Sequence, residues 1–199
     1  MLRALRISIV MMLVMTAITG VIYPLTITVI ANTVFAFQSR GSVMLDGQRA
    51  IGSELIGQTF TDPGYFWSRP SATGPIPYNA ASSSGSNLGP SNPALQTAIQ
   101  ERVQKLKAAD NSQTSQVPID LVTASASGLD PDISPAAANF QVSRVAQRRG
   151  VPDTEVKQLV FRYTAGRQLG LLGEPRVNVL KLNLALDQAF PLKKATVQK

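Results

Sequence analysis

The sequence of 199 residues contains no cysteine and no histidine, and only 6% of its residues are aromatic. Without cysteine, neither a disulfide framework nor a thiolate nucleophile is available. Without histidine, the commonest general base is missing, and so are the imidazole ligands of soft metal ions. The residue types on which such metal centres and catalytic dyads are built are therefore not present.

The familiar catalytic spacings are missing as well. No G-x-S-x-G elbow occurs, and "SGSNLG" at Ser84–Gly89 lacks the lysine of a phosphate-binding loop. Asp130 and Asp132 are spaced as paired carboxylates would be, for a hard cation or for acid–base work. The alternative, which we favour, is that they form turns ahead of a helix that starts after Ser134. We expect no catalytic residue and no metal ligand.

Charged residues are absent from Ile7 to Ser39, and the first part of this stretch is almost wholly apolar. About 20 apolar residues suffice to cross a hydrocarbon layer as a helix. A cleaved signal peptide, cut after Ala36, is the alternative, but its apolar centre would be shorter, roughly 7–15 residues. We predict a single transmembrane anchor at residues 1–39, in contact with membrane lipid, and a soluble domain at residues 40–199.

The basic flanks of this span indicate its orientation, because Lys and Arg are retained preferentially on the cytoplasmic side. Arg3 and Arg6 precede the span, whereas Arg40 and Arg49 beyond it are accompanied by Asp46. We therefore expect a cytoplasmic amino terminus and a soluble domain outside the cytoplasm.

Small residues lie on one face of the predicted span. Thr16 and Gly20 are four residues apart, and Pro24 follows one turn later. Small residues at this spacing allow another helix to approach closely, and proline is tolerated best where neighbouring groups compensate for its missing donor. Thr16, Gly20 and Pro24 are therefore the predicted helix-packing face.

The remainder predicts one α+β domain. Residues 41–60 indicate short strands joined by turns, and 117–122 a strand through Leu121 and Val122. Helices are predicted from Pro93 to about Ala109, over 135–149 with Arg148 and Arg149 in the last turn, and from Val156 to near Gly166. Residues 176–190 alternate with period two and predict a bulged strand. Tyr65, Phe66 and Trp67 are expected as a core plug beneath a long loop.

Two loops are candidates for contact with other molecules. Tyr78–Pro93 is rich in serine and glycine, and we predict an ordered, partner-facing loop there, formed by Ser84, Gly85, Ser86, Asn87 and Gly89. Gly166–Leu180 carries several glycines beside charged side chains, which suits a nucleotide or a protein partner; the candidate cofactor-binding residues are Arg167, Gln168, Gly170 and Gly173. Nucleic acid is not expected as a partner, because the basic residues are scattered and not interleaved with aromatics.

Seven stretches, taken jointly and in order, resemble the C subunit of Kdp-type potassium-transporting P-type ATPases. They are "YPL" at 23–25, "ELIGQTF" from Glu54, "YFWSRPSA" from Tyr65, "YNAASSSGSNLGPSNP" from Tyr78, "VPIDLVTASASGLDPDISPAAA" from Val117, "QVSRVAQRRG" from Gln141 and "GRQLGLLGEPRVNVLKLNLALD" from Gly166.

The resemblance implies a single-span subunit of a bacterial inner-membrane complex that imports potassium with ATP. Its implied partners are an ATP-hydrolysing subunit, a channel-like subunit that carries potassium, and a small single-span subunit. The chain has no D-K-T-G phosphorylation motif, so it is expected to be accessory, with no firmly bound cofactor and ATP only through the complex. A catalytic-chaperone role is also implied, in which the subunit raises the ATP affinity of its partner. An independent membrane-anchored envelope binding domain is the alternative.

Overall fold

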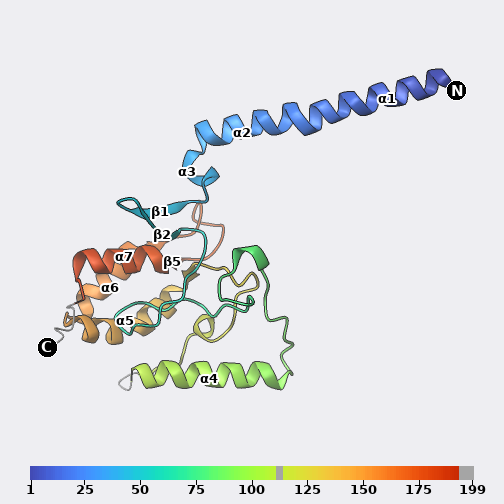
Figure 1. Cartoon of the computed structure of the whole chain (residues 1–199). Coiled ribbons are helices and arrows are strands. Elements are labelled where there is room, and N and C mark those ends of the chain that lie inside the picture. Colours follow the sequence, from blue (N-terminus) through green and yellow to red (C-terminus); the bar gives the residue numbers. More distant parts are fainter. Residues whose placement is uncertain (111–113, 193–199) are drawn as a thin grey trace, which may run out of the picture. The chain divides into compact units, whose positions relative to one another are not determined.

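The computed structural model describes residues 1–110 and 114–192. The chain divides into two compact units, Met1–Met44 and Leu45–Lys199. The first is helical and the second combines helices with short strands (Figure 1), so the predicted mixed α+β composition behind an apolar helix is confirmed.

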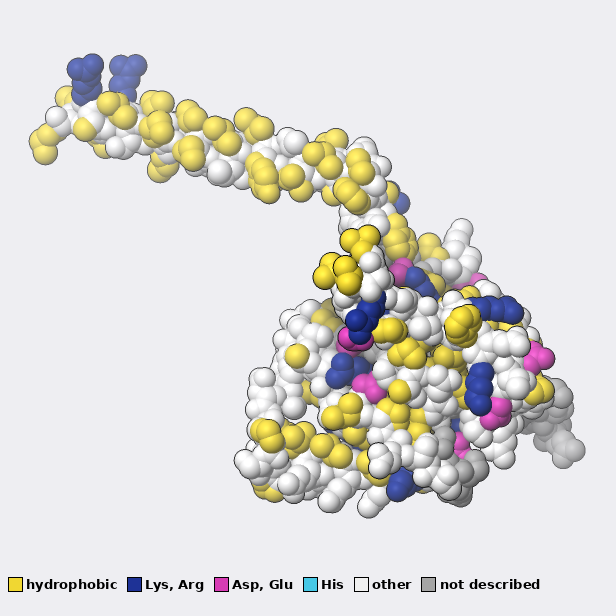
Figure 2. All heavy atoms as spheres, turned by 180° about the vertical axis from the view of Figure 1, so that it is seen from behind, with side chains coloured by type: hydrophobic (Ala, Val, Ile, Leu, Met, Phe, Trp, Pro, Cys, Tyr) yellow, Lys and Arg dark blue, Asp and Glu magenta, His cyan; other side chains and the backbone are white. Residues whose placement is uncertain are grey.

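The first unit is an almost unbroken apolar helix. Its parts are α1 (Leu2–Ala17), a π-helical turn (Ile18–Ile22), α2 (Tyr23–Val34) and the short α3 (Ala36–Ser39). The 33 residues of Leu2–Val34 have a mean hydropathy of 2.1 and are long and apolar enough to cross a membrane. Figure 2 shows hydrophobic side chains along the whole helix and basic side chains at its amino-terminal end.

Pro24 accounts for the π-helical turn. Proline has no N–H to donate, and its ring collides with the carbonyl four residues earlier, here that of Gly20, so the helix widens locally. The hydroxyls of Thr19 and Thr26 donate to Met15 O at 2.7 Å and Ile22 O at 2.8 Å, so their polarity is satisfied within the helix. A Cβ added to Gly20 would lie 3.9 Å from the Thr16 methyl, so these two residues share a face. The packing face of Thr16, Gly20 and Pro24 stays a prediction.

The strands predicted after the span form a hairpin. β1 (Val43–Asp46) and β2 (Arg49–Ser53) make a two-stranded sheet. The chain turns at Gly47, whose φ of +61° lies in the left-handed region that favours glycine.

The helix predicted from Pro93 is confirmed as α4 (Pro93–Ala109). Pro93 occupies the first turn, where its missing donor costs nothing, and the Asn92 side chain accepts from Ala94 N at 2.9 Å. Leu106 on α4 is buried, and Ile99 and Val103 pack against the core. These three residues therefore form the face by which α4 packs on the domain.

The centre of the second unit is formed by three helices and a small antiparallel sheet (Figure 1). The helices are α5 (Pro135–Arg149), α6 (Asp153–Arg162) and α7 (Val179–Ala189). The sheet has the order β3 (Asp132–Ile133), β5 (Arg176–Asn178), β4 (Thr164–Ala165). The core contains valines, leucines and alanines from all three helices together with Val177 of β5.

The prediction of a bulged strand over residues 176–190 is wrong beyond Asn178. Only β5 is extended, and α7 follows it directly, capped by the Asn178 side chain, which accepts from Lys181 N at 3.1 Å. Val179, Leu182 and Leu186 are buried and recur at helical spacing. The same residues fit both the period of a strand and that of a helix, and the Leu, Lys, Ala and Gln content favours the helix.

Two smaller predictions also need correction. Leu121 and Val122, expected in a strand, are buried but belong to a 3₁₀ turn over Ile119–Leu121 and its end, because Pro118 directs the chain into a turn. The helix expected to run to near Gly166 ends at Arg162, and the chain then enters β4, whose Thr164 pairs with Val177. A turn replaced the strand that local periodicity suggested for the first segment. Strand pairing ended the helix that it suggested for the second.

Candidate functional site

The extended aromatic segment, Tyr65–Trp67, runs through the centre of the second unit. Side chains of the helices bond to its backbone, as a neighbouring strand would. Phe66 is fully buried, as the predicted core plug. Its N–H donates to Asn183 Oδ1 at 2.8 Å and its carbonyl accepts from Asn183 Nδ2 at 3.0 Å. Trp67 makes the same pair of bonds with Gln141, at 2.8 and 3.1 Å. Two side-chain amides thus supply the pairing that a strand would otherwise provide.

Arg144 of α5 reinforces this segment from within the core. Its Nη1 donates to Pro63 O and to Tyr65 O at 3.0 Å, and its Nη2 to Gln141 Oε1 at 2.7 Å. The guanidinium carbon lies 4.2 Å from the centre of the Trp67 ring. Burial lowers the pKa of Arg144 to about 10, against the opposing attraction of nearby aspartates, so the group is charged at neutral pH.

Arg149, at the end of α5, is also used internally. Its side chain is fully buried and donates to Gly64 O at 2.8 Å, to Phe190 O at 2.6 Å and to Asp187 Oδ1 at 2.9 Å. It lies 4.9 Å from the Tyr65 ring centre, and the Tyr65 hydroxyl donates to Asp187 at 2.9 Å. Burial, with the neighbouring Asp187, raises the pKa of Tyr65. Both buried arginines therefore hold the domain's own backbone.

The serine- and glycine-rich loop is anchored at its base. Ser84 N and Ser83 Oγ both donate to Ser127 O at 3.0 Å. A Cβ on Gly85 would lie 2.8 Å from Ala126 O, so these two segments of the chain approach as closely as glycine allows. Ser84, Ser86, Asn87 and Gly89 are exposed and Gly85 is half-buried. These contacts fix the base of the loop, and the ordered, partner-facing surface stays a prediction.

Ser71 connects this loop to the aromatic segment. Its hydroxyl donates to Gly128 O at 2.7 Å and accepts from Tyr78 N at 2.9 Å. Gly128 has φ +68°, and a Cβ there would lie 2.5 Å from the Thr73 methyl and 2.6 Å from Ser84 O. Three stretches of chain that are distant in sequence therefore meet around a single glycine.

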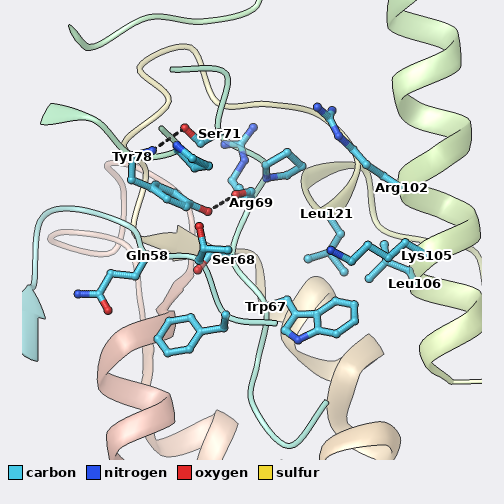
Figure 3. Close-up of a pocket in the computed structure, with 14 residues that line it drawn as sticks. Gln58, Trp67, Ser68, Arg69, Ser71, Tyr78, Arg102, Lys105, Leu106 and Leu121 are labelled. Carbon is cyan, nitrogen blue, oxygen red and sulfur yellow. Dashed lines mark hydrogen bonds between the residues drawn. The ribbon is translucent and has the colours of Figure 1, made fainter. Parts of the chain in front are cut away.

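A pocket of about 260 Å³ lies between α4 and the loop that follows the aromatic segment. Figure 3 shows Lys105 reaching from α4 toward this loop, with Arg69 and Tyr78 on the opposite wall. Arg69 pairs with Asp130 at 2.9 Å, and Arg102 donates to Val122 O at 2.7 Å. Burial lowers the pKa of Arg102 and raises that of Tyr78.

This basic pocket was not predicted from the sequence, because its residues come from five separate stretches of the chain and match no motif. Its volume is below the roughly 300–1,000 Å³ of typical ligand sites, and Lys105 lies 5.5 Å from the Trp67 ring centre, where it is already attracted to the ring. A small anionic group fits these dimensions and charges better than a whole nucleotide does.

The paired carboxylates are arranged as turn and strand residues. Asp130 Oδ1 accepts from Asp132 N at 3.0 Å, which forms the expected turn. Asp132 pairs with Arg176 at 3.1 Å, and burial raises its pKa. Within residues 1–110 and 114–192, no group of three or more Asp and Glu side chains could hold a metal ion.

The four candidate cofactor residues lie in a small hairpin between β4 and β5. Arg167 Nη2 donates to both Glu174 oxygens, at 2.7 and 2.8 Å. Gln168 N donates to Leu172 O at 2.8 Å, and Gly170 and Gly173 both have φ of +75°. The Arg167 guanidinium, the candidate nucleotide contact, is thus paired with a carboxylate of the same hairpin. The two glycines occupy the left-handed positions of the turns of this hairpin.

Comparison with known proteins gives one consistent result. Residues 5–188 match the family model KdpC, described as the c chain of K⁺-transporting ATPase. A potassium-transporting ATPase KdpC subunit from Polaromonas naphthalenivorans is 58% identical over 188 residues, covering 94% of this chain and 96% of the relative. The subunit of the same name from Herpetosiphon aurantiacus is 60% identical over 176 residues, covering 88% and 91%. The chain therefore belongs to the KdpC family and is an accessory subunit of a potassium transport complex.

Proposed function

We propose that this chain is a non-catalytic subunit that stabilises the assembled potassium importer, anchored in the bacterial inner membrane by Leu2–Val34. The observation that carries the proposal is the use made of the buried polar side chains. Arg144, Arg149, Gln141 and Asn183 all bond to the domain's own backbone. A domain built in this way is a rigid scaffold, and the chain has no D-K-T-G motif with which to form an aspartyl-phosphate.

Its partners in this proposal are the ATP-hydrolysing subunit, the channel-like subunit and the small single-span subunit. The experiment is co-expression of all four chains with an affinity tag on the ATP-hydrolysing subunit. Omitting this chain is expected to lower the recovered channel-like subunit about tenfold, which corresponds to about 1.4 kcal/mol of assembly free energy. Unchanged recovery, with this chain purifying alone, would instead support an independent envelope binding domain.

The proposed topology places the amino terminus in the cytoplasm and the second unit outside it. Arg3 and Arg6 supply the basic flank that favours this orientation. Because the chain has no cysteine, single cysteines report cleanly. The exposed Gln96→Cys is expected to react with a membrane-impermeant maleimide on intact spheroplasts, and Leu2→Cys only after permeabilisation. The reverse pattern would contradict the orientation.

A catalytic-chaperone effect is the second part of the proposal. Membership of the KdpC family is what supports it, because the resemblance implies this role. In the proposed topology the second unit lies outside the cytoplasm, so the increase in ATP affinity would be transmitted between subunits as a coupling free energy, without direct contact with ATP. The KM for ATP, measured in the same co-expression experiment with and without this chain, is expected to be higher without it.

A further inference from the structure

The hairpin between β4 and β5 displays leucines to solvent. We call residues 167–174 the leucine hairpin. Leu169, Leu171 and Leu172 are 91%, 80% and 60% exposed. Single exposed leucines are ordinary, but three within four positions at the end of one hairpin form an apolar tip, and contiguous apolar surface of this kind marks an interaction site.

The leucine hairpin is held in one conformation. Gln168 and Leu172 exchange backbone hydrogen bonds of 2.8 and 2.9 Å, and Leu171 N donates to Gln168 O at 3.1 Å. Arg167 Nη2 donates to both oxygens of Glu174, and this ion pair closes the base of the hairpin. These contacts fix the backbone of the leucine hairpin, so its apolar tip is presented in one preformed conformation.

Leu169 lies in the turn of the leucine hairpin. Its φ is +53° and that of Gly170 is +75°, so two consecutive left-handed residues form the turn between the paired Gln168 and Leu172. This geometry leaves the Leu169 side chain almost fully exposed at the end of the hairpin.

From these observations we propose that the leucine hairpin docks into an apolar recess on another protein subunit of the transport complex. The inference rests on the proposed assembly role and names one surface that performs it. The leucines would form the buried centre of the contact, and Arg167 and Glu174 would form its polar rim, which is the usual anatomy of a protein interface.

The charges of the hairpin and its stem favour a protein over a lipid surface or a nucleotide. Arg167 is paired with Glu174, and Arg176 at the start of β5 is paired with Asp132 at 3.1 Å. Segments that bind anionic lipid present free Lys or Arg, often beside aromatic side chains. Within residues 167–174 there is no aromatic residue and the one cation is neutralised.

The test uses the full complex with all subunits. The variant carries Leu169→Ser, Leu171→Ser and Leu172→Ser together, and is expected to lower recovery of this chain with the tagged ATP-hydrolysing subunit about tenfold. The matched control carries Ile119→Ser and Ile76→Ser, which are 74% and 61% exposed and lie in other loops; its recovery is expected to be unchanged. The thermal midpoint of the triple variant alone in detergent should equal that of the parent, since the leucines lie outside the core.

A second measurement identifies the occupant. A photo-crosslinking benzoylphenylalanine at position 171 in the assembled complex is expected to crosslink to one protein subunit. Crosslinking to lipid alone, or normal recovery of the triple variant, would overturn the docking inference. If omitting the whole chain leaves the other subunits assembled, the assembly role itself fails. If omission disrupts assembly and the triple variant does not, only the inference about the leucine hairpin fails.

Discussion

Replacing Arg144 by alanine is expected to lower the free energy of unfolding of the second unit by about 3–5 kcal/mol. The guanidinium satisfies the carbonyls of Pro63 and Tyr65 and the side chain of Gln141, and it covers one face of Trp67. Alanine would remove this donor from the carbonyls of Pro63 and Tyr65, whereas Gln141 Oε1 would keep its bond from Trp67 N. A buried acceptor left without a donor costs about 1–3 kcal/mol. It would also open a cavity beside the tryptophan.

Arg148→Ala is the matched control, because Arg148 is the same residue type on the same helix but is exposed. Its effect is expected to stay within about 0.5 kcal/mol. Urea unfolding of the detergent-solubilised chain measures both, with the single tryptophan as the probe. Midpoints for the two variants that agree within error would show that the buried arginine does not support the aromatic segment.

Replacing Gly128 by alanine is expected to lower the free energy of unfolding by about 2–5 kcal/mol, the sum of left-handed strain and overpacking. At φ +68° the new Cβ would lie 2.5 Å from the Thr73 methyl and 2.6 Å from Ser84 O. Because Ser84 O is backbone, it cannot move aside without displacing the serine- and glycine-rich loop.

Gly150→Ala separates the two contributions. Gly150 also has φ +68°, but nothing lies within 4 Å of its added Cβ, so this variant reports the left-handed conformation alone, about 1–2 kcal/mol. The same urea titration is used, with limited proteolysis of residues 78–89 as a local readout. Faster cleavage is expected in the Gly128 variant only; equal losses for both variants would refute crowding around Gly128.

Local signals were enough to predict several elements. Asn92 with Pro93 and Ser134 with Pro135 mark the starts of α4 and α5, and in both helices the cap side chain accepts from the backbone as expected. Gly150 ends α5 in the left-handed conformation. These features depend on residues within one or two turns, so the sequence contains all that is needed to recognise them.

Elements that depend on distant partners were predicted less well. Residues 179–189 fit both a strand and a helix, and burial of Val179, Leu182 and Leu186 against the core selects the helix. Arg149 was expected only as a cation suited to the helix end, yet its side chain is fully buried against Gly64 and Asp187. The basic pocket joins separate stretches and carries no motif.

The sequence by itself determined the family, the apolar amino-terminal helix, the absence of histidine and cysteine chemistry, and the positions of the capped helices. Tertiary structure alone decided that Gln141 and Asn183 pair with the backbone of the aromatic segment, and that Leu169, Leu171 and Leu172 are exposed together. The physical reason is the distance along the chain over which each interaction acts. Caps and apolar runs act between neighbours in the chain, whereas burial and the satisfaction of buried polar groups depend on which distant segments meet.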